Sequence, residues 1–168
     1  GTPLWIAGGD VDGDLDRDLV VVRHNANSTD VWINDGSGTF TAGQQMPVGT
    51  DALAVVLGDI DADDDLDVLV SRPVAPEIVV YLGDGTGVFV PDYPIALPGG
   101  GSAFNLQVGD VTRDGFADLV VADPALSRVL VFPGDGGKDF GQFVYELAIP
   151  GAPRAVSIGD LSGDGLPD

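Results

Sequence analysis

A tandem repeat of about 50 residues constrains the fold of this chain more than any other feature of its sequence. Four segments align without gaps: GDVDGDLDRDLVV from Gly9, GDIDADDDLDVLV from Gly58, GDVTRDGFADLVV from Gly109 and GDLSGDGLPD from Gly159. Their first aspartates follow one another at spacings of 49, 51 and 50 residues, at Asp10, Asp59, Asp110 and Asp160. The repeat predicts four units, which are residues 1–49, 50–98, 99–150 and an incomplete 151–168.

The shared register extends beyond these aligned segments. An Asp-Gly pair begins 17 residues after the ninth residue of each of the first three loops, at Asp35, Asp84 and Asp135. A phenylalanine follows five residues further on, at Phe40, Phe89 and Phe140. Every unit therefore follows one structural plan, and we interpret residues 1–168 as a single repeat array.

Short apolar, β-branched runs bounded by turn residues predict an all-β fold. The expected strands are residues 4–8, 19–23, 30–34 and 40–48 in the first unit, and 55–59, 68–72, 77–83 and 88–97 in the second. Apolar residues do not recur at helical spacing over a dozen positions, and the 25 glycines and 12 prolines disfavour helices. Each complete unit is thus predicted to hold four strands.

Four strands per unit, repeated at this period, match the blade of a β-propeller. About three blades and the start of a fourth are present, so we expect part of a larger propeller or assembly, continued by a longer chain or by a homo-oligomer. A β-solenoid or a row of small sandwiches is the alternative. Solenoid coils usually have shorter periods, which favours the propeller.

Each unit carries one nine-residue loop that offers oxygen ligands at alternate positions. Counted from the first aspartate, the side-chain ligands at positions 1, 3, 5 and 9 are Asp10, Asp12, Asp14 and Asp18; Asp59, Asp61, Asp63 and Asp67; Asp110, Thr112, Asp114 and Asp118; and Asp160, Ser162, Asp164 and Asp168. Position 7 varies in type, as expected of a residue that contributes only its backbone carbonyl, and is Asp16, Asp65, Phe116 or Leu166. Position 2 is always apolar, at Val11, Ile60, Val111 and Leu161, and is expected to point into the blade core.

Ca²⁺ is the cation that such loops favour, because it takes six to eight hard oxygen ligands. Seventeen of the 27 acidic residues lie in the four loops, and this crowding would be repulsive without a cation. Ordinary solvated turns are the alternative interpretation, since Asp and Gly are common turn residues. An EF-hand is excluded because its position 12 needs a glutamate, where these loops have Val21, Val70 and Val121. We predict up to four Ca²⁺ ions, one per loop.

Composition limits the partners and the chemistry of the chain. A net charge of −20 with only seven Lys and Arg argues against nucleic acid and anionic membrane surfaces. No apolar stretch approaches the ~18 residues that a membrane-spanning helix needs, so no membrane insertion is expected. The absence of Cys, with one His and two Glu, leaves no nucleophile and base pair to single out, and we do not expect an enzyme.

The D-x-D-x-D-x-x-x-D loop, with the later NDGSGTF from Asn34 and GDGTGVF from Gly83, resembles the FG-GAP and VCBS repeats found in integrin α-subunit propellers and in secreted microbial proteins. The resemblance covers essentially the whole chain. It implies calcium ligands at the positions above, an integrin-like propeller, and an extracellular or cell-surface location. The family usually has Gly at position 6, which Leu15 and Asp64 replace, so the turn is less certain in the first two loops. Thr112 and Ser162 replace a carboxylate, and we predict weaker Ca²⁺ binding there.

Three function classes are compatible with these features. The leading hypothesis is a calcium-stabilised extracellular module for adhesion or for recognition of a glycan or protein ligand. The second is a structural subunit of a surface layer or filament, assembled through open blade ends. The least favoured is a non-catalytic part of a secreted polysaccharide-active enzyme.

Overall fold

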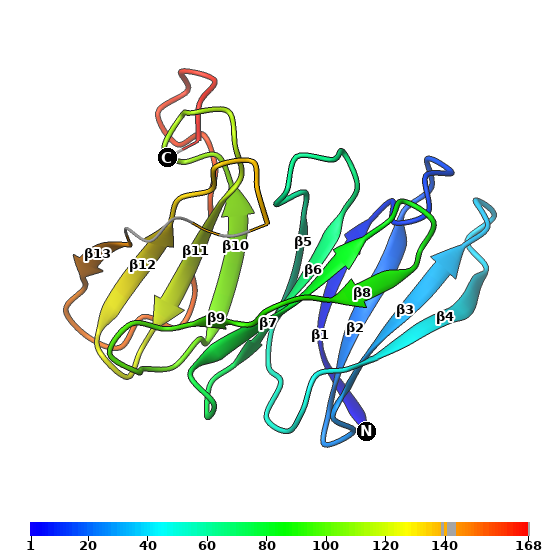
Figure 1. Cartoon of the computed structure of the whole chain (residues 1–168), viewed down its shortest axis with the longest axis horizontal. Helices are drawn as coiled ribbons and strands as arrows, with labels where there is room; N and C mark the ends of the chain where they lie inside the picture. Colours follow the sequence, from blue (N-terminus) through cyan, green and yellow to red (C-terminus); the bar gives the residue numbers. More distant parts are fainter. Residues whose placement is uncertain (139, 141–143, 168) are drawn as a thin grey trace.

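The computed structural model describes residues 1–138, 140 and 144–167, and its strands form three adjacent antiparallel sheets (Figure 1). Blade 1 contains β1 (Thr2–Gly9), β2 (Asp18–His24), β3 (Ser28–Asn34) and β4 (Phe40–Pro47). Blade 2 contains β5 (Val55–Gly58), β6 (Asp67–Arg72), β7 (Glu77–Gly83), β8 (Phe89–Pro91) and β9 (Ile95–Ala96). Blade 3 contains β10 (Asn105–Gly109), β11 (Asp118–Asp123), β12 (Arg128–Phe132) and β13 (Tyr145–Ala148).

Every regular element among the described residues is a strand, which confirms the predicted all-β class. Strands within each blade pair in chain order, and the three blades stand side by side like part of an open propeller (Figure 1). The first strand of each blade is innermost, where β5 contacts both β1 and β10. No helix in the described part of the chain is long and apolar enough to cross a membrane.

The sequence predicts the fourth strand of blade 2 as one run over residues 88–97, and the structure differs from this prediction. The strand is divided into β8 and β9, which both pair with β7. Proline is the physical reason, because Pro94 lies between the two pieces and has no backbone N–H to donate to the ladder.

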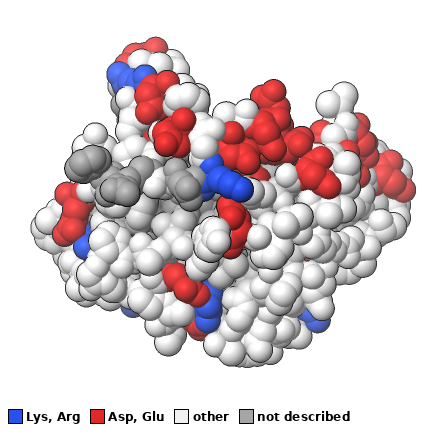
Figure 2. Space-filling view, viewed as in Figure 1, with Lys and Arg blue, Asp and Glu red and all other residues white. Residues whose placement is uncertain are grey.

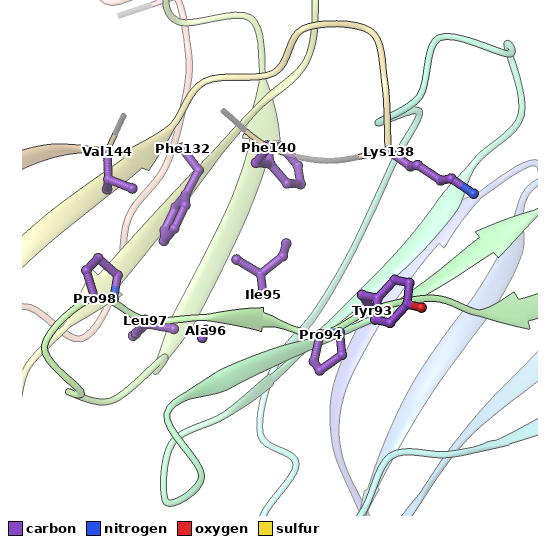
Figure 3. Close-up of a pocket in the computed structure, with 10 residues that line it drawn as sticks. All are labelled: Tyr93, Pro94, Ile95, Ala96, Leu97, Pro98, Phe132, Lys138, Phe140 and Val144. Carbon is purple, nitrogen blue, oxygen red and sulfur yellow. The ribbon is translucent and has the colours of Figure 1, made fainter. Parts of the chain in front are cut away.

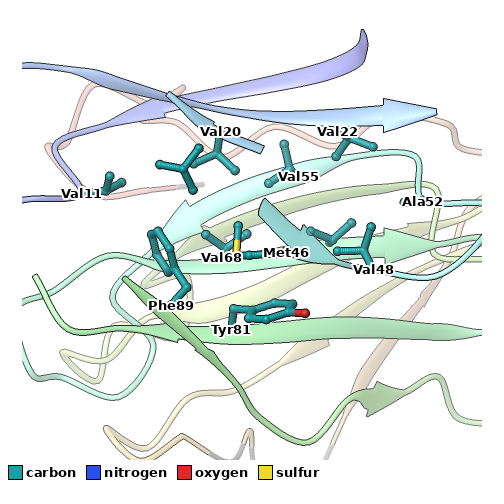
Figure 4. Packing of buried hydrophobic residues seen from close by; sticks show 12 residues of the cluster. Val11, Val20, Val22, Met46, Val48, Ala52, Val55, Val68, Tyr81 and Phe89 are labelled. Atoms are coloured by element: carbon teal, nitrogen blue, oxygen red, sulfur yellow. The ribbon is translucent and has the colours of Figure 1, made fainter. Parts of the chain in front are cut away.

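The hydrophobic core lies between the blades, in two clusters. Alternate residues of β6 supply both: Val68 and Val70 pack toward blade 1, and Leu69 packs toward blade 3. Figure 4 shows the first cluster, in which Val20 and Val22 of β2 face Val55 and Val68. Both faces of the middle sheet are therefore buried, which explains its nearly continuous apolar run.

At each blade junction a glycine leaves room for a side chain of the following blade, and we call this gap the glycine notch. A Cβ at Gly58 would lie 2.5 Å from Cγ1 of Val108 in blade 3. In the same way, a Cβ at Gly9 would lie 3.1 Å from Cδ1 of Leu57 in blade 2. Leu57, which precedes Gly58, therefore packs against Gly9 of the preceding unit. In the same way Val108, which precedes Gly109, packs against Gly58.

The third notch is filled by the chain that follows blade 3. Ile158 lies against Gly109, with its Cδ1 3.4 Å from the position of a Cβ there. The Val156 N–H donates to Asn105 Oδ1 at 2.9 Å, and the Arg154 guanidinium lies 4.8 Å from the centre of the Phe104 ring. Residues 151–158 thus run beside β10, where the innermost strand of a fourth blade would lie.

Ion pairs hold the blade ends that lie away from the aspartate loops. Arg72 and Glu77 face each other across β6 and β7 and form an ion pair. At the matching place in blade 3, Asp123 faces Arg128, and Nε of Arg128 lies 2.8 Å from Asp123 Oδ2. The two blades therefore keep the same pair with its charges exchanged. Because the acidic and basic residues exchange places between the two blades, the repeat pattern in the sequence did not reveal this pair.

Candidate metal sites

The first aspartate of each loop organises the turn around its carboxylate. Asp110 accepts the N–H groups of Arg113 and Asp114 on Oδ1, at 2.6 and 3.1 Å, and that of Gly115 on Oδ2 at 3.0 Å. Asp160 accepts the same three N–H groups of the fourth loop, at 2.6, 3.1 and 2.8 Å. A short side chain can do this because its oxygens reach the backbone only a few residues ahead.

In the first three loops, the ninth aspartate is fully buried and ties the loop to its blade. Asp67 accepts the Ile60 N–H on Oδ2 at 2.8 Å and the Gly83 N–H on Oδ1 at 2.9 Å. The corresponding bonds recur in the other two blades, where Asp18 accepts from Val11 and Asn34, and Asp118 from Val111 and Gly134. This carboxylate therefore joins the loop entrance to the third strand or its end.

Two left-handed backbone positions shape every loop. At position 6, Leu15 and Asp64 have φ of 74° and 73°, close to the 94° and 85° of Gly115 and Gly165. The turn that the sequence left uncertain in the first two loops is therefore kept without glycine. Position 4 is also left-handed, at Gly13, Ala62, Arg113 and Gly163. Sequence reasoning missed position 4, although glycine in two of the four loops was an available signal.

The first two loops bring three carboxylates around one centre. One oxygen each from Asp10, Asp12 and Asp18 lie within 4.8 Å of one another, and the same holds for Asp59, Asp61 and Asp67. The structure thus gathers positions 1, 3 and 9 of both loops. In the third loop Thr112 stands at position 3, with its Oγ1 3.4 Å from Asp118 Oδ1. Asp168 lies outside the described residues, so the ninth position of the fourth loop has no structural account.

The electrostatics of these clusters are compatible with a bound cation. Burial raises the pKa of Asp67 to about 6, although the N–H groups of Ile60 and Gly83 oppose this rise. Burial and the neighbouring Asp63 raise the pKa of Asp61. Burial, followed by Asp14 and Asp18, raises the pKa of Asp12. Asp61 Oδ1 is also buried and accepts no hydrogen bond from the described residues. An all-oxygen donor set with an unused buried oxygen fits a hard cation such as Ca²⁺.

Position 5 contributes to the turn itself. Its Oδ1 accepts the N–H of position 7 at 2.8–3.0 Å in all four loops, from Asp14, Asp63, Asp114 and Asp164. These carboxylates are not part of the two three-carboxylate groups found among the described residues. Their predicted role as ligands stays a prediction.

In the first three loops, the side chain at position 7 packs against the glycine of the repeated Asp-Gly pair. A Cβ at Gly36 would lie 2.3 Å from Asp16 Oδ2, and a Cβ at Gly85 would lie 2.3 Å from Asp65 Oδ1. Phe116 lies against Gly136 in the same way. The repeated Asp-Gly pair therefore leaves room for the position 7 side chain, a contact that the sequence did not reveal. The predicted carbonyl ligands at Asp16, Asp65, Phe116 and Leu166 stay a prediction.

The apolar second position follows its prediction only where a further blade covers it. Val11 and Ile60 are buried in the two interblade clusters. Val111 is half-buried, and Leu161 is 87% exposed. Leu161 therefore departs from the expected core position, because the described chain supplies no neighbouring blade to cover it.

All four loops lie along one edge of the array. Figure 1 shows this edge uppermost, and Figure 2 shows many of the acidic side chains along it in the same view. Arg113 of the third loop approaches Asp164 of the fourth, with Nη2 3.9 Å from Oδ2, so these two loops are close neighbours. The array therefore presents its acidic loops along one edge.

The comparison with family models agrees with this geometry. The model of the FG-GAP-like repeat matches residues 10–70, 71–121 and 113–168, which together span nearly the whole chain. No curated protein matches the sequence. The matched segments contain the four aspartate loops and the strands from β2 onward, and β1 lies before them. On these grounds, the chain belongs to the FG-GAP-like repeat family.

Proposed function

We propose that this chain is an extracellular or cell-surface module in which Ca²⁺ bound to the aspartate loops stabilises blades used for adhesion or ligand recognition. The observation that carries the calcium proposal is the convergence of three carboxylates in each of the first two loops. Those carboxylates come from positions 1, 3 and 9, and the ninth is buried and bonded to its blade. A cation held there would therefore be connected directly to the sheet.

The donor chemistry favours Ca²⁺ over other biological cations. The chain has no Cys and one His, so it lacks the thiolate and imidazole ligands that zinc and copper prefer. Mg²⁺ keeps several of its waters and is seldom held by an all-protein set of ligands. Clustered aspartates with nearby backbone carbonyls suit the larger, more flexible coordination of Ca²⁺.

Binding would act as folding free energy. Carboxylates gathered within 4.8 Å repel one another, and an ion that binds only the folded state stabilises it. We expect chelation to lower the melting temperature by several degrees or more.

Calorimetric titration of the calcium-free protein tests the proposal. Wild type is expected to show up to four binding events, and Asp61→Asn is expected to lose the site in the second loop. Asp64→Asn is a matched control, because it removes one exposed charge from the same loop without touching the three-carboxylate cluster. No heat from wild type, or equal losses in both variants, would mean that the loops are acidic turns.

A pocket between blades 2 and 3 supports the ligand-recognition part of the proposal. It encloses about 390 Å³ and is lined by Ile95, Leu97, Phe132 and Phe140, with Tyr93 and Lys138 at one side (Figure 3). Apolar walls with a phenol and an ammonium suit a glycan or a peptide. Tyr93→Ala is expected to weaken binding to any immobilised glycan that retains the wild-type chain on an array. Unchanged retention would remove this pocket from the proposal.

A further inference from the structure

The turn between β7 and β8 of blade 2 lies beside the first aspartate loop, which belongs to blade 1 (Figure 1). We call residues 84–87 the Asp84 turn. The Gly87 N–H donates to the Val11 carbonyl of the first loop at 2.8 Å. A Cβ at Gly13 would lie 3.3 Å from the Gly85 carbonyl oxygen. The turn of one blade is therefore in backbone contact with the loop of the preceding blade at two places.

The Asp84 turn is held by internal hydrogen bonds and leaves little room for a side chain at Gly87. Asp84 Oδ1 accepts the Thr86 N–H at 3.0 Å and the Thr86 hydroxyl at 2.6 Å. Gly87 has a φ of 77°, and a Cβ there would lie 3.2 Å from Ile33 Cδ1 and 3.5 Å from Asp12 Cβ. Asp12 is one of the three carboxylates gathered in the first loop. A shift of the turn would therefore act directly on a candidate ligand of the first loop.

The same segment is also joined to the second loop, in its own blade. The Gly83 N–H, one residue before the turn, donates to Oδ1 of the buried ninth aspartate, Asp67, at 2.9 Å. The Asp65 carboxylate lies against Gly85, where a Cβ would be 2.3 Å from Asp65 Oδ1. One short stretch of chain thus connects a candidate ligand of the first site to a candidate ligand of the second.

The equivalent turn of blade 3, residues 135–138, is not bonded to the loop of the preceding blade. Lys138 stands at the position of Gly87. Among the described residues, no hydrogen bond joins this turn to the second loop. The Lys138 side chain instead lines the pocket that also contains Tyr93 (Figure 3). The sequence change from glycine to lysine therefore accompanies the loss of the interblade bond.

A hollow of about 290 Å³ occupies the place of this contact at the junction of blades 2 and 3. It is lined by Ala62 of the second loop, Phe116 of the third loop and Gly136 of the turn. Ala62 and Gly136 stand at the repeat positions of Gly13 and Gly85, which are in close contact at the first junction. The second and third loops consequently lack the connection that the first and second loops have.

We propose that the Asp84 turn couples the first two metal sites, so that Ca²⁺ in either loop raises the affinity of the other, while the third loop binds its ion independently of the second. This coupling presupposes the calcium binding proposed above. Ordering of Asp12 or Asp67 around an ion fixes the loop backbone, and with it the segment that contains Gly83 and Gly87. The other loop then loses less conformational freedom when it binds its own ion, which is positive coupling.

Calorimetry of single-site variants measures the coupling. Asp61→Asn removes the second site and leaves the first, and Asp12→Asn does the reverse. The overall two-ion constant of wild type, divided by the product of these two association constants, gives the coupling factor. We expect a factor of at least about fivefold. Asp110→Asn, in the third loop, should leave the affinities of the first two loops within about twofold of wild type.

Two glycine variants show whether the turn carries the coupling. Gly87→Ala should bring the factor to about one, because the added methyl group pushes the turn away from Ile33 and Asp12. Gly38→Ala is the paired control at the same repeat position of blade 1, where φ is 86° and a Cβ meets nothing within 4 Å. It introduces the same left-handed strain and leaves the repulsion between the two ions unchanged. It should therefore keep the wild-type factor.

Hydrogen exchange of the Gly87 amide, followed by NMR, gives a readout that does not depend on the titration. Calcium added to Asp12→Asn fills the second loop and should slow this exchange at least about fivefold, with no change at Gly38. Absence of calcium binding by wild type would remove the proposed function and the coupling together. Binding by both single-site variants with a factor of one, or equal factors in Gly87→Ala and Gly38→Ala, would overturn the coupling alone.

Discussion

Leu15 carries a full side chain into a backbone conformation that glycine adopts at the same position of the third and fourth loops. The left-handed conformation costs a residue with a Cβ roughly 1–2 kcal/mol relative to its preferred regions. The side chain is 90% exposed, so little packing offsets this cost. The hydrogen bond from the Leu15 N–H to Asp10 Oδ2, at 2.9 Å, shows what holds the residue in place.

Replacing Leu15 with glycine should therefore stabilise the chain. Relief of strain is partly offset by the greater freedom of glycine in the unfolded state, so we expect a gain of about 0.5–1 kcal/mol. Gly115→Leu makes the reverse change at the matching position and should cost a similar amount. Urea denaturation of both variants measures the free energies, and a loss of stability in Leu15→Gly would contradict the argument.

Thr112 gives a direct test of how carboxylate number sets affinity. Thr112→Asp would place a carboxylate at position 3, as Asp61 does in the second loop. We expect Ca²⁺ affinity at the third loop to rise about tenfold or more, because affinity follows ligand charge. Asp61→Thr should weaken the second loop correspondingly. Calorimetry measures both changes. If Thr112→Asp leaves the Ca²⁺ affinity of the third loop unchanged, position 3 does not contact the ion there.

At the scale of the strands, turn chemistry and repetition predicted much of the fold. β2, β3, β6 and β7 were expected because apolar runs lie between an aspartate loop and an Asp-Gly turn. The division between β8 and β9 was missed, since the effect of Pro94 depends on which ladder bonds the strand must make.

The candidate site was predicted in part for a similar reason. Aspartate spacing indicated positions 1, 3, 5 and 9, of which the structure gathers 1, 3 and 9 in the first two loops. Spacing alone could not show that the ninth carboxylate is buried and bonds to a residue 16 positions away, such as Gly83 for Asp67. Nor could it show the left-handed Ala62 and Arg113, whose residue types give no hint of that backbone conformation.

The glycine notch makes a prediction about blade docking. Gly58→Ala places a methyl group into Val108 and should cost about 1–3 kcal/mol, because the junction must move apart. Gly159→Ala is the matched control at the same repeat position, where a Cβ meets nothing within 4 Å, and should be nearly neutral. Thermal unfolding compares the two, and equal effects would mean that the notch does not set the spacing of the blades.

At the scale of the whole molecule, the loops link stability to pH. Burial raises the pKa of Asp67 to about 6, so the folded state binds this proton more tightly than the unfolded chain does. The stabilisation from that proton is fully present below pH ~4 and is lost as the pH rises through about 6. Asp12 and Asp61 act in the same direction.

The calcium-free chain should therefore be more stable at pH 5 than at pH 7. Calcium should reverse the trend, because protons and Ca²⁺ compete for the same carboxylates. Groups whose pKa is lowered, such as Asp160, change stability only at still lower pH. Thermal unfolding at both pH values, with calcium removed by dialysis and then restored, measures the effect. A calcium-free chain that loses stability at pH 5 would contradict it.

The notch glycines Gly9, Gly58 and Gly109 each stand immediately before the first aspartate of a loop. The backbone that receives the next blade is thus continuous with the backbone that presents the first ligand. An ion in one loop can strengthen the docking of the following blade. Thermodynamic reciprocity then requires that this docking raises the affinity of the loop for the ion by the same factor. Where calcium occupies the loops as proposed, force that pulls a terminal blade away would therefore also weaken the hold on the ion beside it.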